Sequence, residues 1–82
     1  MNSRLKLHIS RHMAQRMAER GVLLEHAKNV VHYGSAQDKP SQKGLNGGKV
    51  KVFSKTDCDR KLVVVAEIKN NDCWLLTSYY ES

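Results

Sequence analysis

Apolar residues in the first part of the chain recur at intervals of three or four, which is typical of amphipathic helices. Met13 and Met17 lie four apart in a predicted helix over about Ser10–Arg20, which begins at a good N-cap residue and ends before Gly21. A second helix is predicted over about Leu23–Tyr33, where apolar residues again follow one face. Because so few residues separate the two helices, they must form a hairpin or a corner.

After Gly34, which is placed to end the second helix, the pattern changes to one typical of strands. Ser35–Gln42 is polar and contains a proline, so it suits an edge strand or a loop. Lys49–Lys55 alternates as a half-buried strand does, and the apolar run Lys61–Lys69 is the predicted central strand. Cys73–Tyr80 is the predicted last strand. The segments between the strands are turns, rich in Gly at 44–48, in Asp at 56–60 and in Asn at 70–72.

This order of elements predicts a single α+β domain over residues 1–82. The N-terminal helical hairpin should pack on one face of a three- to four-stranded antiparallel sheet and leave the other face open. The chain is too short for two domains, and its core is expected to be thin.

The charge of the chain is positive and uneven. Lys and Arg number 14 against eight acidic residues, which gives a formal charge of +6 and a pI near 9.6. Residues 1–55 carry most of the basic groups, whereas residues 56–82 are mildly acidic. This polarity favours a nucleic acid, an acidic protein or an anionic membrane as partner. Charge that serves only solubility is the alternative.

Targeting and metal-binding patterns are not apparent in the sequence. The start of the chain lacks the apolar run of a signal peptide, and no stretch has the length of a membrane span. Cys58 and Cys73 are interpreted as free thiols in a reducing cytoplasm, with Cys73 buried in the last strand. The spacing of Cys and His does not suit a zinc site, and we expect no metal or other cofactor.

His12, Arg16 and Arg20 fall four residues apart on the first helix and therefore form one stripe. The stripe borders the apolar face, where it predicts an anion site with a titratable group beside it. Arginines that lay their stems over a small core are the alternative. His8, His26 and His32 carry less weight as functional residues.

The strand over Lys49–Lys55 places Lys49, Lys51, Phe53 and Lys55 on the face opposite to its valines. With the valines against the helices, the open face would carry lysines interleaved with an aromatic ring, as a groove that follows a phosphate backbone requires. Lysines that protect an exposed strand are the alternative.

The end of the last strand carries hydroxyl side chains on both of its faces. Thr77 and Tyr79 share one face, and Ser78 and Tyr80 share the other. A slip of one residue in register exchanges the two pairs, so the sequence leaves open which pair meets the open face.

The run from His12 to Val22 resembles the opening of a family of short bacterial proteins of unassigned function. Its motif is His, then Arg four residues later, Met, two variable residues, Arg, Gly and a branched apolar residue. The segment Leu75-Leu76-Thr77 matches the apolar-apolar-Thr close of that family. The family is similar to the RelE, colicin, EndoU and barnase group of RNase folds, many of which are toxins.

The resemblance implies two helices on a four-stranded antiparallel sheet and cleavage of RNA without a metal ion. It marks His12, Arg16 and Arg20 on the helix and Thr77 on the strand, and we add Tyr79 because it shares a face with Thr77. In such cleavage the ribose 2′-hydroxyl attacks the phosphate and leaves a 2′,3′-cyclic phosphate. His12 suits proton transfer, and Arg16 with Lys49 or Lys51 suits stabilisation of the phosphorane.

The expected function is therefore that of a metal-independent endoribonuclease of the kind found among toxins, with Arg20, Lys49, Lys51 and Lys55 binding the RNA. A toxin would require a neutralising partner, for which an acidic antitoxin or immunity protein is the simplest choice. Two alternatives remain open. One is a nucleic-acid-binding module without catalysis, and the other is a domain that docks an acidic protein.

Overall fold

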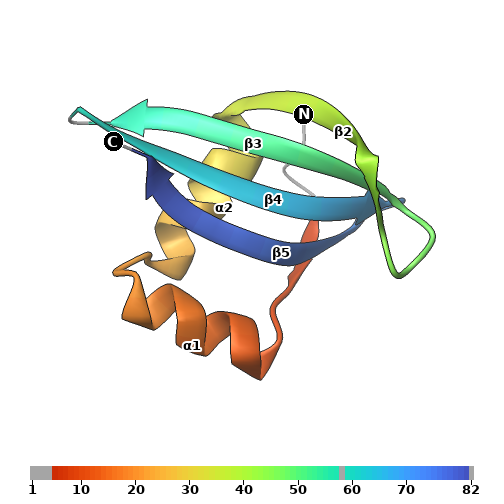
Figure 1. Cartoon of the computed structure of the whole chain (residues 1–82), viewed down its shortest axis with the longest axis horizontal. Coiled ribbons are helices and arrows are strands. Elements are labelled where there is room, and N and C mark those ends of the chain that lie inside the picture. Colours follow the sequence, from red (N-terminus) through yellow and green to blue (C-terminus); the bar gives the residue numbers. More distant parts are fainter. Residues whose placement is uncertain (1–4, 58, 82) are drawn as a thin grey trace.

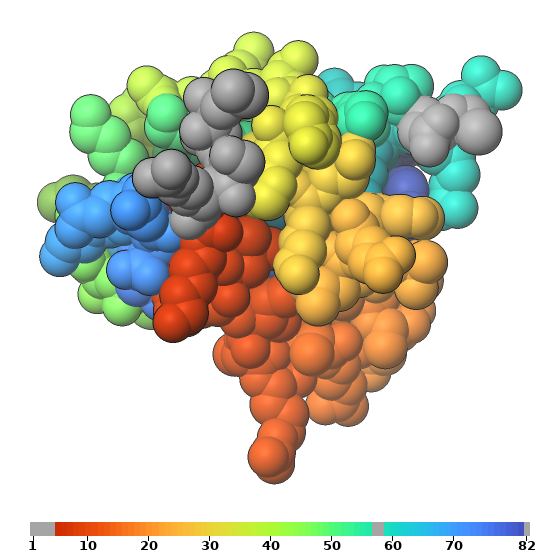
Figure 2. All heavy atoms as spheres, turned by 180° about the vertical axis from the view of Figure 1, so that it is seen from behind, coloured from red at the N-terminus to blue at the C-terminus, as the bar shows by residue number. Residues whose placement is uncertain are grey.

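The structure is a computed structural model that describes residues 5–57 and 59–81, in which two helices lie on one face of a five-stranded sheet (Figure 1). In chain order, the elements are β1 (Lys6–His8), α1 (Arg11–Glu19), α2 (Leu24–Tyr33), β2 (Ser35–Lys43), β3 (Lys49–Asp57), β4 (Arg60–Lys69) and β5 (Asp72–Glu81). The strands lie in the order β1-β5-β4-β3-β2, so the predicted central strand does occupy the centre. Helix α1 packs on β5, and α2 packs on β3 and β4. Seen from behind, the two helices occupy the centre and the lower part of this side of the molecule (Figure 2).

The sheet differs from the predicted three or four antiparallel strands, because β1 adds a fifth strand that runs parallel to β5. The Lys6 N–H donates to the Asn71 carbonyl at 2.7 Å. His8 Nε2 lies 2.9 Å from the Asp72 carboxylate, and the His8 ring stacks on Trp74. A strand of three residues is too short to show an alternation, and its partner lies 64 residues away in sequence. Its pairing therefore depends on tertiary contacts that local patterns do not encode.

Helix α1 begins and ends where its capping residues predict. The Ser10 Oγ accepts a hydrogen bond from the Met13 N–H at 3.0 Å. At the other end, the Gly21 N–H donates to the Ala18 carbonyl and the Val22 N–H donates to the Met17 carbonyl. These two bonds form a Schellman motif, which requires the left-handed backbone that Gly21 adopts at φ +69°. The corner between the helices follows from this local geometry.

Helix α2 also ends at its predicted glycine, but for a different reason. Gly34 has an extended backbone, with φ −80° and ψ 173°. A Cβ at this position would lie 2.5 Å from the Ser54 carbonyl oxygen and equally close to that of Val30. Glycine is required here because α2 and β3 approach each other closely. No helix within residues 5–57 and 59–81 is long and apolar enough to span a membrane.

The main core lies between the helices and the sheet. Its buried residues come from both helices, the segment between them and three strands: Met13, Met17, Val22, Ala27, Val30, Val31, Phe53, Leu62, Val64, Ala66, Cys73 and Leu75. Burial raises the pKa of the Cys73 thiol to about 11, so this cysteine is a core residue, as predicted. The expectation of a free thiol at Cys58 falls outside the described residues.

The position of Phe53 in the core corrects the predicted orientation of β3. Phe53 is 2% exposed and lies against the helices. Because side chains alternate along a strand, Lys49, Lys51 and Lys55 share this helix-covered face, and the valines of β3 lie on the other. We expected the opposite arrangement. Both faces of β3 carry apolar residues, and the phenylalanine, which has the larger apolar area, occupies the core under the helices.

The other face of the sheet is partly closed by the loop between β2 and β3. Glu67, which points to this face, is fully buried, and its carboxylate accepts hydrogen bonds from the Asn46 N–H at 2.9 Å and the Gly48 N–H at 2.6 Å. Burial acts to raise the pKa of Glu67, but bonds from Gly48, Asn46 and Leu45 outweigh it and lower the pKa below its usual value. A Cβ at Gly44 would collide with this carboxylate. The glycine-rich segment predicted as a flexible turn is therefore tied to β4.

Candidate functional site

A cavity of about 540 Å³ lies between α2 and the ends of three strands. Residues of α2, β3, β4 and β5 line it, namely Glu25, His26, Asn29, Val30, Lys55, Arg60, Leu62 and Tyr80. In a domain of this size, a concave surface where charged and aromatic side chains meet is the first place to look for a ligand site.

The strand residues of the cavity form a row across the sheet. Lys55 of β3 pairs with Leu62 of β4, and Leu62 pairs with Tyr80 of β5. Neighbouring strands lie about 4.8 Å apart, so the backbones at Lys55 and Tyr80 are separated by roughly 10 Å. Arg60 precedes Leu62 by two residues and projects to the same face. The register of the sheet thus brings a lysine, an arginine and a tyrosine to one side.

Helix α2 supplies the opposite wall of the cavity. Ala27, Val30 and Val31 are buried against the sheet. His26 and Asn29 border this buried stripe and are exposed. Their spacing of three places them on neighbouring turns of the helix, so both side chains reach the cavity.

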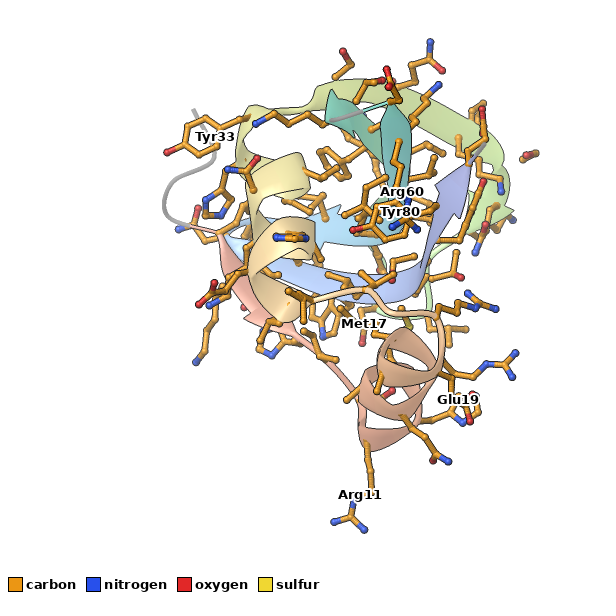
Figure 3. All side chains as sticks on the ribbon, turned by 90° about the vertical axis from the view of Figure 1, so that its left-hand side faces the viewer. Arg11, Met17, Glu19, Tyr33, Arg60 and Tyr80 are labelled. Carbon is orange, nitrogen blue, oxygen red and sulfur yellow. The ribbon has the colours of Figure 1, made fainter. Side chains whose placement is uncertain are left out.

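Direct contacts join the side chains of the two walls. The Lys55 Nζ donates to the Asn29 Oδ1 at 2.6 Å. The His26 Nδ1 lies 3.4 Å from the Tyr80 hydroxyl. The Arg60 guanidinium lies over the Tyr80 ring, 3.7 Å from its centre (Figure 3). Each functional group is therefore held by a neighbour from another element.

The cavity has the charge required to bind an anion. Lys55 and Arg60 contribute two positive charges, and Glu25 is the acidic residue of the lining. The ion pairs between described residues are His8–Asp72, Lys51–Asp38 and Lys61–Glu81, and none of them includes these two cations. A phosphate group would meet two cations, while the imidazole and the phenol beside them are groups that transfer protons.

Two residues marked by the helix and strand motifs meet at a different place. Arg20 Nη1 donates to the Thr77 Oγ1 at 3.2 Å and to the Ser78 carbonyl at 3.0 Å. Because β1 pairs only with Asp72–Trp74, this part of β5 lies beyond β1 along the strand. The Arg20–Thr77 contact therefore joins the end of α1 to β5.

His12 and Arg16 lie on the exposed side of α1, whose buried residues are Met13 and Met17. Neither lines the cavity. Figure 3 shows α1 projecting from the sheet, with Arg11 at its outer end and pointing away. The structure thus brings Arg20 to Thr77 but does not gather the whole stripe with the strand residues.

Tyr79 and Tyr80 lie on opposite faces because successive side chains of a strand alternate, and an irregularity earlier in β5 decides which of the two faces the helices. Ala66 pairs with Leu75, whereas the preceding Val65 pairs with Thr77, so Leu76 is an extra residue. After this bulge, Tyr80 falls on the helix-covered face, and Thr77 and Tyr79 fall on the other. Tyr79 is 39% exposed there and is not among the residues that line the cavity.

The three lysines of β3 do not share one site. Lys55 joins the cavity described above. Lys51 lies 3.8 Å from the Asp38 carboxylate. Lys49 lines a second cavity, of about 430 Å³, together with Lys39 and Lys43 and the glycines of the β2–β3 loop.

His26, Arg60 and Tyr80 are the residues of the cavity that sequence reasoning missed. His26 received little weight as one of four histidines, and Arg60 stands in the part of the chain that is acidic overall. One signal was available: a short hairpin between the strands over 49–55 and 61–69 aligns Lys55 with Leu62 and so brings Arg60 close to the end of the strand that carries Lys55.

The chain has no match among curated proteins or among solved structures. Its similarity to known proteins comes from a family model, which covers α1, α2, β2, β3 and β4 in full and β5 up to Tyr80. Residues 9–80 match the model of the family described as Domain of unknown function (DUF4258), and the chain belongs to that family.

Proposed function

We propose that this protein is a metal-independent endoribonuclease whose active site is the cavity between α2 and the ends of β3, β4 and β5. The observation that carries the proposal is the convergence of His26, Lys55, Arg60 and Tyr80 on one cavity. Cleavage of RNA without a metal ion needs proton transfer at two oxygens and fixed positive charge at the phosphate. These four side chains supply both requirements.

The contacts in the cavity suggest how the proton moves. With the proton on Nδ1, His26 donates to the Tyr80 hydroxyl oxygen, and its free Nε2 accepts the proton of the ribose 2′-hydroxyl. The 2′-oxygen then attacks phosphorus, the bond from phosphorus to the 5′-oxygen breaks, and Tyr80 donates its proton to the leaving oxygen. The products are a 2′,3′-cyclic phosphate and a free 5′-hydroxyl. Transfer of the Nδ1 proton to the phenolate restores a neutral histidine and tyrosine.

Lys55 and Arg60 stabilise the charge that develops in this reaction. Lys55 belongs to the row of Lys55, Leu62 and Tyr80, and Arg60 lies beside that row, so a phosphate bound there would meet both cations. The Arg60 guanidinium also lies 3.7 Å from the centre of the Tyr80 ring, so it favours the phenolate while the leaving oxygen takes its proton. Removal of one such group typically lowers the rate by two to three orders of magnitude.

The resemblance of residues 12–22 to the short bacterial family, and through it to RelE-like RNase folds, is part of the proposal. Two helices that precede the main antiparallel strands support this likeness. We extend the proposal to a toxin that acts on RNA in the cytoplasm and is neutralised by an acidic protein. Such a protein would complement the two cations of the cavity.

The test is incubation of the purified protein with total bacterial RNA in excess EDTA. We expect discrete fragments with cyclic-phosphate ends. His26→Ala, Lys55→Ala and Arg60→Ala should each lower the rate about 100-fold or more. Arg11→Ala, purified in the same way, is the control because Arg11 points away from the sheet (Figure 3).

Two outcomes would overturn parts of this proposal. Intact RNA at high protein concentration would rule out the nuclease. Loss of cleavage in His12→Ala and Arg16→Ala, with cleavage retained in His26→Ala, would move the active site to the exposed stripe of α1.

A second candidate function is binding of nucleic acid without cleavage. The observation that favours it is the second cavity, whose lining holds Lys39, Lys43 and Lys49 but no histidine or tyrosine. Binding that weakens steeply with salt, with no cleavage product, would support this function.

A further inference from the structure

Beyond the cavity lining, the same side of α2 carries an exposed aromatic ring. Tyr33 lies seven residues after His26 and four after Asn29, so the three side chains form one stripe along α2. The Tyr33 side chain is 73% exposed, which is unusual for an aromatic residue in the last turn of a helix packed on a core. Figure 3 shows it projecting from the end of α2, apart from Arg60 and Tyr80.

Lys55 connects this ring to the cavity. Its Nζ lies 6.0 Å from the centre of the Tyr33 ring and 2.6 Å from the Asn29 Oδ1. The Lys55 cation thus lies between the exposed Tyr33 ring and the other residues that line the cavity. Tyr80 differs in this respect, because Arg60 already covers its ring.

We infer that Tyr33 is a stacking platform for one unpaired base of single-stranded RNA, whose backbone phosphate is bound by Lys55. An aromatic ring beside a cation matches the alternation of base and phosphate in a nucleotide. A base can stack on Tyr33 only when it is free of its own pairing partner, so the site selects single strands over duplexes. This inference rests on the proposed function, which gives RNA as the substrate class. It adds that the RNA is bound as a single strand.

The experiment measures binding separately from cleavage. A short single-stranded oligonucleotide carrying 2′-O-methyl groups at every position has no attacking hydroxyl, so it remains intact. Its affinity is compared with that of a duplex of the same sequence. We expect Tyr33→Ala to weaken single-strand binding roughly 5- to 150-fold. Tyr33→Phe should remain within about twofold of the unchanged protein, because stacking needs only the ring.

Tyr79→Ala is the matched control, since Tyr79 is an exposed tyrosine on the other face of the sheet. It should leave binding unchanged. Thermal unfolding of each variant checks that the fold is retained. A scan with one abasic position at a time identifies the stacked base. At that position, removing the base and removing the Tyr33 ring should together weaken binding no more than either change alone.

The outcomes separate this inference from the proposed nuclease. Cleavage of RNA with single-strand affinity unchanged in Tyr33→Ala would overturn the inference alone. Weakened single-strand binding in Tyr33→Ala without cleavage of natural RNA would support the inference and overturn the nuclease. Equal loss of affinity for the duplex, or for inorganic polyphosphate, would show that Tyr33 does not bind a base.

Discussion

The guanidinium of Arg60 lies over the ring of Tyr80, with its central carbon 3.7 Å from the ring centre. The hydroxyl of the same tyrosine lies 3.4 Å from His26 Nδ1. One phenol therefore contacts a permanent cation through its ring and an imidazole through its oxygen. These two contacts join strands β4 and β5 to helix α2 within the cavity lining.

Arg60 should be required for cleavage, and a lysine in its place should restore only part of the rate. Arg60→Ala removes both the cation at the phosphate and the stack on Tyr80, and we expect cleavage to fall about 100- to 1000-fold. Arg60→Lys keeps the charge but loses the planar stack, so its rate should lie between the two. Single-turnover rates, with thermal unfolding as a check on folding, measure this. Equal rates for Arg60→Ala and the unchanged protein would exclude Arg60 from the site.

Phe53→Ala should destabilise the protein by about 3–5 kcal/mol, because a large buried ring leaves a cavity under α2. Lys51→Ala, two residues earlier on the same face, is the control. Its ion pair with Asp38 is partly exposed, so its loss should cost about 1 kcal/mol or less. Urea unfolding gives both values. A small cost for Phe53→Ala would place this ring on the outer face, as the sequence pattern alone predicted.

Two glycines should respond differently to a side chain. At Gly34 the backbone is one that alanine can adopt, but there is no space for its Cβ. We therefore expect Gly34→Ala to lower the free energy of unfolding by about 1–3 kcal/mol, because α2 and β3 must move apart. Gly21→Ala has space but a left-handed backbone, which costs about 1–2 kcal/mol. Asparagine separates the two causes, because it tolerates the left-handed region. Gly21→Asn should recover much of the stability, and recovery by Gly34→Asn would contradict the steric explanation.

Glu67 should make the stability depend on pH in the acid range. Its pKa in the folded protein is lowered from the ordinary value of 4.5, so the ionised carboxylate favours the folded state. This contribution is fully present above about pH 4.5 and is lost as the pH falls through the lowered value. Glu67→Gln should be less stable at neutral pH and should lose less stability on acidification. Urea unfolding from pH 3 to 7 measures both curves, and parallel curves would contradict this role of Glu67.

The sequence by itself determined the elements whose signals are local. Ser10 and Gly21 set the ends of α1, because the hydrogen bonds that cap a helix join residues a few positions apart. The continuous apolar run identified β4 as the central strand, because a strand between two neighbours and under helices buries both faces. The α+β class followed from the order of these elements.

Tertiary structure decided what depends on residues distant in the chain. The three residues of β1 form a strand only because β5 offers them a partner. The extra residue at Leu76 exchanges the faces of β5, so Tyr80 rather than Tyr79 reaches the cavity. His26 and Tyr80 lie 54 residues apart and meet only through the packing of α2 on the sheet. Capping and periodicity act within a few residues, whereas register and packing set which distant side chains share a cavity, and the candidate site depends on these nonlocal contacts.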